Sequence, residues 1–152
     1  MKKTILLIGL VILLSACSTP QDLSRSEQVV EGALTVFKSP TCGCCTSWGE
    51  HMQDSGYEVV YVDDMGLESL KQELDIPNSV WSCHTTIVDE YFIEGHVSEE
   101  IVAQLLSERP DIDGIAMAGM PVGSAGMPGL KSQDFVVHAI EDGRVLYEFA
   151  RI

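Results

Sequence analysis

The stretch Leu34-Thr35-Val36-Phe37-Lys38, then Ser39-Pro40-Thr41, then Cys42-Gly43-Cys44-Cys45, decides how this chain is expected to fold. Its first five residues have the branched and aromatic character of a strand, and the Ser-Pro-Thr triplet is typical of a turn. Residues 46–53 have helical character. A helix amino terminus carries partial positive charge, which favours thiolate over thiol. The sequence therefore predicts reactive cysteines at the start of a helix.

The cysteine motif holds one sulfur more than a redox pair requires. Cys42 and Cys45 form C-x-x-C, and Cys44 adds a C-x-C spacing; a further cysteine, Cys83, follows later. An even count in an exported chain suggests disulfides, and the unstrained pairing joins Cys42 to Cys45 and Cys44 to Cys83. A domain of this size does not need such bridges to fold, so purely structural bridges are the weaker interpretation.

The next segments alternate between strand-like and helical patterns. Strands are predicted at residues 58–62, 85–89 and 91–94, the last two as an antiparallel hairpin, and helices at 67–74 and 98–108. Pro77 and Pro110 follow the two helices, as helix-terminating residues do. The resulting order, β-α-β-α-β-β-α, predicts a thioredoxin-like α/β fold.

That fold places the loop entering its third strand beside the amino terminus of its first helix. In this chain the loop carries Cys83 and His84. A fourth sulfur and an imidazole are therefore expected to face the cysteine motif, although the sequence spacing alone would not bring them together.

Residues 113–129 are predicted to form a loop, because their glycines and prolines forbid a regular helix. The loop carries Met117, Met120 and Met127. Thioethers are soft ligands suited to Cu(I), but loop methionines that merely pack over the domain explain the pattern equally well. After this loop, residues 135–140 and 145–149 flank Asp-Gly and predict a C-terminal β-hairpin extension.

The amino terminus has the features of a secretory signal. Two lysines precede the apolar run from Ile5 to Leu14, which is too short to span a bilayer. The Leu-Ser-Ala-Cys ending resembles a bacterial lipobox, so residues 1–16 are predicted to be removed and Cys17 to be lipidated. Ser18 resembles the residue found in lipoproteins sorted to the outer membrane. We therefore expect a periplasmic protein held by a membrane lipid anchor.

The remaining chain divides into two parts. Residues 17–32 are polar and without clear periodicity, which predicts a flexible tether, and residues 33–152 are long enough for one domain. The whole sequence has 9 basic and 23 acidic residues and a formal net charge of -14. A balance so acidic argues against nucleic acid as a partner.

The candidate site residues are soft donors. They are Cys42, Cys44, Cys45, Cys83 and His84, with Met120 or Met127 from the loop. Such ligands select Cu(I), Zn(II) or iron–sulfur clusters. The C-x-C-C run does not resemble a zinc knuckle, and an iron–sulfur cluster is at odds with an oxidising compartment. Copper fits best, because crowded thiolates can bridge several Cu(I) ions and share their charge.

Four ordered motifs resemble those of the CopG-type copper-resistance proteins, a family formerly described only as a domain of unknown function. They are residues 35–45, 82–85, 93–97 and 119–127, and the resemblance covers roughly residues 33–150. It implies a periplasmic thioredoxin-like domain that holds a cysteine-bridged cluster of several copper ions. It also implies a role in copper redox chemistry or detoxification.

The resemblance carries over residue by residue. The implied metal site consists of Cys42, Cys44, Cys45, Cys83 and His84. Met120 and Met127 match the family's loop, whereas Met117 stands where an apolar residue is expected and gains no copper role. His96 matches as well, but its Gly-His-Val setting also occurs in glutaredoxin-like chains without metal, which favours a structural role.

We therefore predict a lipid-anchored periplasmic protein that binds Cu(I) in copper resistance. It would cycle copper between oxidation states or pass it to other periplasmic copper-handling proteins. The alternative is a thiol–disulfide oxidoreductase with Cys42 as the nucleophile and Cys45 as the resolving residue. Cys44 would compete with Cys45 in such an enzyme, and Thr85 stands about where these enzymes place a cis-proline, but neither point decides between the two.

Overall fold

The structure is a computed structural model that describes residues 24–152. The predicted signal peptide, Cys17 and the first part of the predicted tether lie outside the described residues. Within the described part of the chain, no helix is both long enough and apolar enough to cross a membrane.

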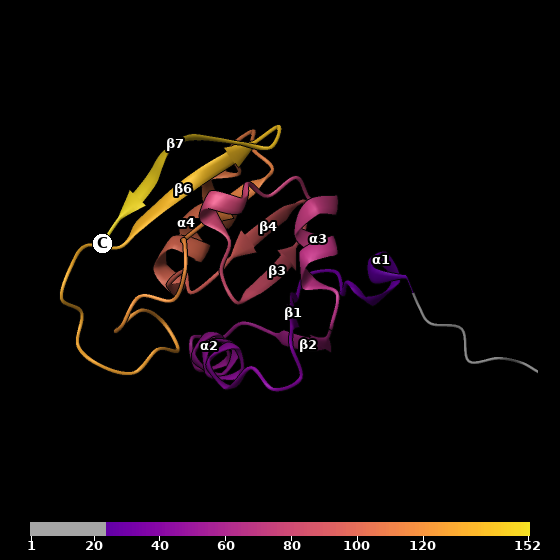
Figure 1. The fold of residues 1–152 in the computed structure, drawn as a ribbon, viewed down its shortest axis with the longest axis horizontal. Helices are drawn as coiled ribbons and strands as arrows, with labels where there is room; N and C mark the ends of the chain where they lie inside the picture. Colours follow the sequence, from indigo (N-terminus) through magenta and orange to yellow (C-terminus); the bar gives the residue numbers. More distant parts are fainter. Residues whose placement is uncertain (1–23) are drawn as a thin grey trace, which may run out of the picture.

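The described chain is a mixed α/β domain built on one seven-stranded sheet (Figure 1). Its elements are α1 (Arg25–Gln28), β1 (Leu34–Lys38), α2 (Gly43–Asp54), β2 (Val59–Asp63), α3 (Leu67–Glu73), the 3-10 turn η1 (Asn78–Val80), β3 (His84–Val88), β4 (Tyr91–Glu94), α4 (Glu99–Glu108), β5 (Gly114–Ala116), β6 (Val136–Glu141) and β7 (Arg144–Arg151). The strand order is β2-β1-β3-β4-β5-β6-β7. The β1–β2 and β4–β5 pairs are parallel, and the other neighbours are antiparallel.

The predicted strands and helices are confirmed, with shifts at their ends. The shift that matters most is at the cysteine motif: α2 begins at Gly43 rather than at Thr46. Cys42 is therefore the N-cap residue, and the other two cysteines of the motif lie in the first helical turn. The C-terminal hairpin is confirmed as β6 and β7, and the connecting Asp142 and Gly143 both have positive φ, as a tight hairpin turn requires.

The prediction of a continuous loop over residues 113–129 is wrong at its start. Gly114–Ala116 forms β5, which pairs with β4 on one side and β6 on the other and so joins the C-terminal hairpin to the sheet. Gly114 is needed there, because a Cβ atom would lie 2.3 Å from the carbonyl oxygen of Phe92. The next residue, Met117, is 2% exposed and belongs to the main core.

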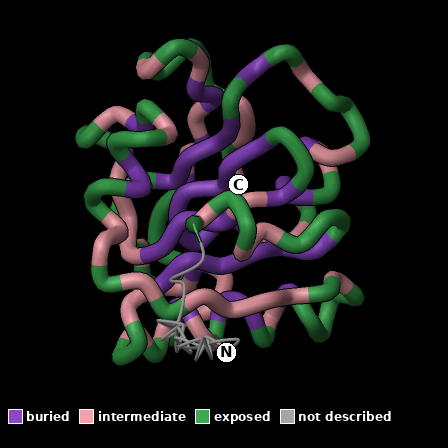
Figure 2. Tube along the Cα trace, turned by 90° about the vertical axis from the view of Figure 1, so that its right-hand side faces the viewer, coloured by how far each residue is buried: buried purple, intermediate pink, exposed green. Residues whose placement is uncertain are grey.

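Two apolar cores lie on opposite faces of the sheet. On the face covered by α2 and α4, Trp48 and Leu105 pack in one cluster with Ile93. On the other face, which α3 and η1 cover, Ile76 packs in a second cluster with Phe92. Figure 2 shows the buried residues gathered along the central strands and the exposed residues in the loops around them.

Side chains alternate between these faces along a strand, which decides where the first residues of β3 point. His84 contacts Trp48 and so faces α2, whereas Thr85 contacts Lys71 and faces α3. We refer to the two sides as the α2 face and the α3 face.

The described part of the predicted tether is attached to the domain. Arg25 of α1 donates hydrogen bonds to Asp64 at 2.7 Å, to Glu73 at 2.8 Å and to the carbonyl oxygen of Gly66 at 2.9 Å. The bond from Arg25 is the main cause that lowers the pKa of Asp64. Contacts with the domain therefore begin ahead of the predicted boundary at residue 33.

Candidate metal centre

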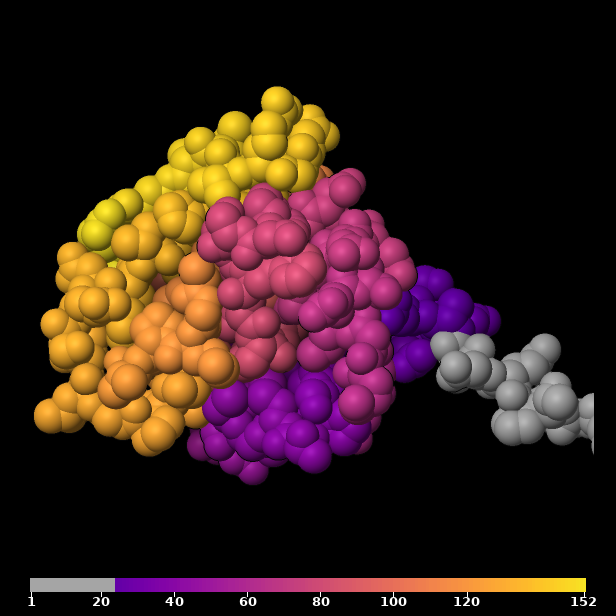
Figure 3. All heavy atoms as spheres, viewed as in Figure 1, coloured from indigo at the N-terminus to yellow at the C-terminus, as the bar shows by residue number. Residues whose placement is uncertain are grey.

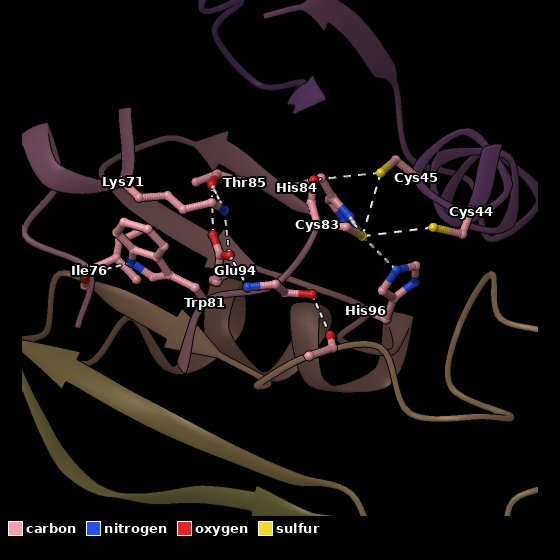
Figure 4. A network of polar contacts seen from close by, with 12 residues as sticks. Cys44, Cys45, Lys71, Ile76, Trp81, Cys83, His84, Thr85, Glu94 and His96 are labelled. Atoms are coloured by element: carbon pink, nitrogen blue, oxygen red, sulfur yellow. Dashed lines mark hydrogen bonds and ion pairs between the residues drawn. The ribbon is translucent and has the colours of Figure 1, made fainter. Parts of the chain in front are cut away.

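Four cysteine sulfurs meet at the amino terminus of α2. Cys44 Sγ lies 3.6 Å from Cys42 Sγ and 3.8 Å from Cys83 Sγ. Cys45 Sγ lies 3.5 Å from Cys83 Sγ, and all four sulfurs are within 4.8 Å of one another. Figure 4 shows Cys44 and Cys45 pointing from the helix toward Cys83, which precedes β3. The expectation that the loop entering β3 brings its cysteine to the motif is confirmed.

The cysteines are in two states. Cys42 and Cys45 form a disulfide with a Cα–Cα distance of 5.4 Å, and Cys44 and Cys83 are free thiols. The second bridge considered from the sequence, between Cys44 and Cys83, is therefore not formed. The disulfide occupies two of the four sulfurs, so all four become available as thiols only after it is reduced.

The surroundings of Cys83 favour the neutral form of its thiol. Burial, and after it the neighbouring Cys44, raises the pKa of Cys83 to about 12. A thiolate at this position therefore needs a cation beside it to compensate its charge. Binding of a thiophilic metal ion would supply that charge and release the proton.

Two imidazoles complete the surroundings of Cys83. Its sulfur lies 3.4 Å from His84 Nδ1 and 3.0 Å from His96 Nε2. His96 Nδ1 is 2.7 Å from the carbonyl oxygen of Ala125, which can only accept, so this nitrogen carries the hydrogen. The lone pair of His96 Nε2 consequently faces the sulfur. Ligand atoms of Cys83, His84 and His96 also lie within 4.8 Å of one another.

His84 has an unfilled hydrogen-bonding position. Its ring is fully buried, 4.8 Å from the ring of Trp48 and 5.0 Å from that of His96, and its Nε2 has no hydrogen-bond partner in the described protein. Burial, followed by His96 and then Lys71, lowers the pKa of His84 well below its ordinary value, and burial also lowers the pKa of His96. Both rings are therefore neutral at physiological pH and offer lone pairs.

The structure brings His96 into contact with the site, although the sequence favoured a structural role for it. Gly95, with φ +81°, turns the chain after β4 so that the next side chain points back to Cys83. A Cβ atom at Gly95 would lie 2.6 Å from the carbonyl oxygen of Met117 and 2.6 Å from Ser82 Oγ. In the sequence, the Gly-His pair after a predicted strand is the feature that could have indicated this approach of His96 to Cys83.

The loop after β5 covers the site, but its methionines differ in how close they lie to the cysteine sulfurs. Met120 is 50% exposed, and its Sδ lies 4.0 Å from Cys44 Sγ. Met127 makes no comparable contact with a cysteine sulfur among the described residues. Gly126, with φ +72°, lies so close to α2 that a Cβ atom would be 2.4 Å from the backbone nitrogen of Trp48. Figure 3 shows the atoms of this loop lying against those of the cysteine-bearing segment.

Comparisons with known families match two parts of the chain. Residues 80–127 match the family described as "Protein of unknown function, DUF411". Residues 1–18 match the prokaryotic membrane lipoprotein lipid attachment site, which supports a membrane-anchored envelope lipoprotein. No curated protein matches the chain.

Two solved structures are similar to the described fold. Form 2 of copper resistance protein CopG is 33% identical, with a TM-score of 0.74 over 81% of this chain and 99% of that chain. Form 1 of the same protein is 34% identical, with a TM-score of 0.73 over 81% and 98% of the two chains. The similarity therefore spans nearly the whole of the compared protein.

Proposed function

Because the chain belongs to the CopG family of copper resistance proteins, we propose that it binds Cu(I) through its four clustered cysteines and contributes to copper resistance. The observation that carries this proposal is the convergence of four sulfurs within 4.8 Å. Thiolates select soft ions such as Cu(I). Sulfurs this close can each bridge two ions, so we propose a centre with several copper ions.

The proposed ligands are residues with a soft sulfur or a neutral imidazole nitrogen. They are Cys42, Cys44, Cys45, Cys83, His84, Met120 and Met127, and the contact with Cys83 adds His96. The buried, neutral ring of His84 supports this set, because its Nδ1 lies 3.4 Å from Cys83 Sγ. Among the loop methionines, geometry favours Met120 over Met127.

Full use of the cluster requires reduction of the Cys42–Cys45 disulfide. Two electrons and two protons from a dithiol partner would convert it to two thiols, while the partner becomes a disulfide. The thiols then lose their protons as copper binds. Copper loading would in this way be coupled to thiol redox chemistry. We propose as a further step that bound Cu(I) gives one electron to an external acceptor and that the resulting Cu(II) takes one electron from an external donor.

The second candidate function is thiol–disulfide exchange with another protein, and the disulfide at the start of α2 favours it. The strand order β2-β1-β3-β4, with thiols at the amino terminus of the following helix, supports a thioredoxin-like unit extended by β5, β6 and β7. In this function Cys42 is the nucleophile and Cys45 the resolving residue. Cys83 Sγ, 3.5 Å from Cys45 Sγ, is the feature that such an enzyme leaves unexplained.

We also propose that Cys17 carries the lipid and that the domain faces the periplasm from the outer membrane. The match to a lipoprotein attachment site supports the anchor. In that position the domain would take copper from the periplasm and exchange it with other copper-handling proteins there.

An anaerobic Cu(I) titration of the reduced protein tests the copper proposal. The wild-type protein is expected to take up more than one Cu(I) per chain, and Cys44→Ser to take up fewer. Met65→Leu is the control, because it removes an exposed sulfur outside the cluster. Uptake of one ion or none, unchanged by Cys44→Ser, contradicts the cluster. Rapid reduction of a protein disulfide by the metal-free protein, dependent on Cys42 and Cys45 alone, would favour the oxidoreductase.

A further inference from the structure

A buried ion pair lies on the α3 face, beside the loop that carries Cys83 (Figure 4). Lys71 of α3 and Glu94 of β4 have side chains that are only 4% and 0% exposed, and Lys71 Nζ lies 2.5 Å from Glu94 Oε1. Neither residue belongs to the sulfur cluster, and neither was a candidate from the sequence.

The Glu94 carboxylate holds the chain on both sides of Cys83 and His84. Before them, the backbone N–H of Ser82 donates to Glu94 Oε1 at 2.5 Å. After them, Thr85 Oγ1 donates to Glu94 Oε2 at 2.6 Å and accepts from Lys71 Nζ at 2.9 Å. One carboxylate thus fixes both ends of the dipeptide that points at the cysteine motif.

The same loop is bonded to the segment that carries Met120. The Ser82 hydroxyl donates to the carbonyl oxygen of Gly119, and the Gly119 N–H donates to the carbonyl oxygen of Trp81 at 3.1 Å. Because Met120 follows Gly119 directly, the position of its sulfur beside Cys44 depends on this connection. We call the set Lys71, Ser82, Thr85, Glu94 and Gly119 the clamp.

A buried ion pair is a poor choice for stability alone. Removing two charges from water costs about as much as their attraction returns, and apolar replacements of such pairs are often neutral or stabilising. The pair instead fixes a geometry, since a carboxylate can accept several hydrogen bonds at once. Its bonds converge on the loop that must present a sulfur at a defined point.

We propose that Glu94 is a positioning residue of the metal centre, which holds the Cys83 and Met120 sulfurs in reach of Cys44, and that Lys71 supplies its buried counter-charge. The expected effect on metal affinity rests on the proposed copper function. The position of Cys83 does not, because it can be measured in the metal-free protein. Two independent readouts therefore separate the two ideas.

The first readout is chemical bridging of Cys44 and Cys83 in the metal-free protein. Their sulfurs are 3.8 Å apart, and they are the two free thiols of the described chain while the Cys42–Cys45 disulfide is intact. A short bifunctional reagent that fluoresces only after joining two thiols reports their separation directly. A global change in stability that leaves the protein folded does not alter this signal.

Two double variants isolate the hydrogen bonds from the charges. Both carry Lys71→Leu; one adds Glu94→Leu and the other Glu94→Gln. Neither leaves a buried charge unpaired, but only the amide can still accept from the Ser82 N–H and bond to Thr85 Oγ1. Thr86→Val is the control, because Thr86 Oγ1 is buried on the same strand without a hydrogen-bond partner.

We expect Lys71→Leu/Glu94→Leu to slow bridging and to lower Cu(I) affinity about tenfold or more, as loss of residues that orient metal ligands does. Lys71→Leu/Glu94→Gln and Thr86→Val should keep wild-type values in both measurements, with thermal unfolding confirming that every variant is folded. If the two double variants behave alike, whether both intact or both impaired, the clamp is overturned. If the wild type takes up no Cu(I) while bridging still separates the double variants, the copper function fails and the positioning role stands.

Discussion

On the α3 face of the sheet, Glu94 accepts hydrogen bonds from Lys71, Ser82 and Thr85, whereas on the α2 face His84 Nε2 has no partner in the described protein. Both groups are buried. The segment around Cys83 connects them, since Ser82 bonds to Glu94 and His84 follows Cys83 directly. The hard oxygen and nitrogen atoms on one side satisfy one another. The sulfurs and imidazoles on the other side are soft or neutral donors gathered around Cys83, which is the arrangement expected of a site that receives a soft ion from outside.

The largest expected effect is a loss of Cu(I) binding when a sulfur of the cluster on the α2 face is removed. Cys83→Ser replaces the sulfur that contacts Cys44, Cys45 and His96 with a hard oxygen, so Cu(I) stoichiometry should fall and the thiolate-to-copper absorption should weaken. Stability of the metal-free protein should hardly change, because serine fills nearly the same space. Unchanged stoichiometry would mean that Cys83 is not a ligand.

The next largest effect is a loss of stability, expected when the ion pair on the α3 face is disrupted. Glu94→Leu without a second substitution leaves Lys71 buried and unpaired, so the free energy of unfolding should fall by about 3–5 kcal/mol. Urea unfolding at neutral pH measures it. A loss below about 1 kcal/mol would show that the carboxylate is not the counter-charge of Lys71.

A smaller effect on stability is expected from titration of the buried His84 imidazole, whose Nε2 has no partner in the described protein. The pKa of His84 is lowered from its ordinary value of 6.5, so below that value the unfolded chain binds the proton more readily. Stability of the metal-free protein should therefore be complete above about pH 6.5 and decrease as the pH falls toward the folded-state pKa. His84→Phe should flatten this decrease, leaving the part due to His96, whose pKa is also lowered. An unchanged slope in unfolding experiments from about pH 7 to pH 5 would show that His84 is not kept neutral.

The smallest effect is expected at the exposed rim of the cluster. Met120→Leu should lower Cu(I) affinity by less than about tenfold, because its thioether is half exposed and touches only Cys44 among the cluster sulfurs. Competition with a Cu(I) chelator measures it, and Met65→Leu is the matched control. An effect as large as that of Cys83→Ser would place Met120 at the centre of the site instead.

Some features of the fold and of the candidate site could be predicted from the sequence, and others could not. The approach of Cys83 to the cysteine motif followed from the order of strands and helices, because fold topology fixes which loops are neighbours. The start of α2 was placed three residues late, since Gly43 and two cysteines give little helical signal. Met117, for which the resemblance implied no copper role, belongs to the main core.

The clamp was not predictable from residue types. Lys71 lies on a short helix, where a lysine ordinarily faces solvent, and Glu94 ends a strand. Their burial depends on how α3 packs over β3 and β4. The contact of His96 with Cys83 was not predictable for a related reason, since the direction of this side chain is set by the left-handed conformation of Gly95 rather than by any periodic pattern. Strand β5 was missed because three residues within a glycine-rich segment carry no alternation.

The attachment of Arg25 to Asp64 and Glu73 also limits how far the protein could travel from a membrane. The eight peptide links from Cys17 to Arg25 span at most about 28 Å when fully extended. With lipid on Cys17, the domain would remain within about 28 Å of the bilayer surface, which is less than one domain diameter. Its search for a copper donor or acceptor would then be nearly two-dimensional, and a partner would have to come to that surface for the exchange.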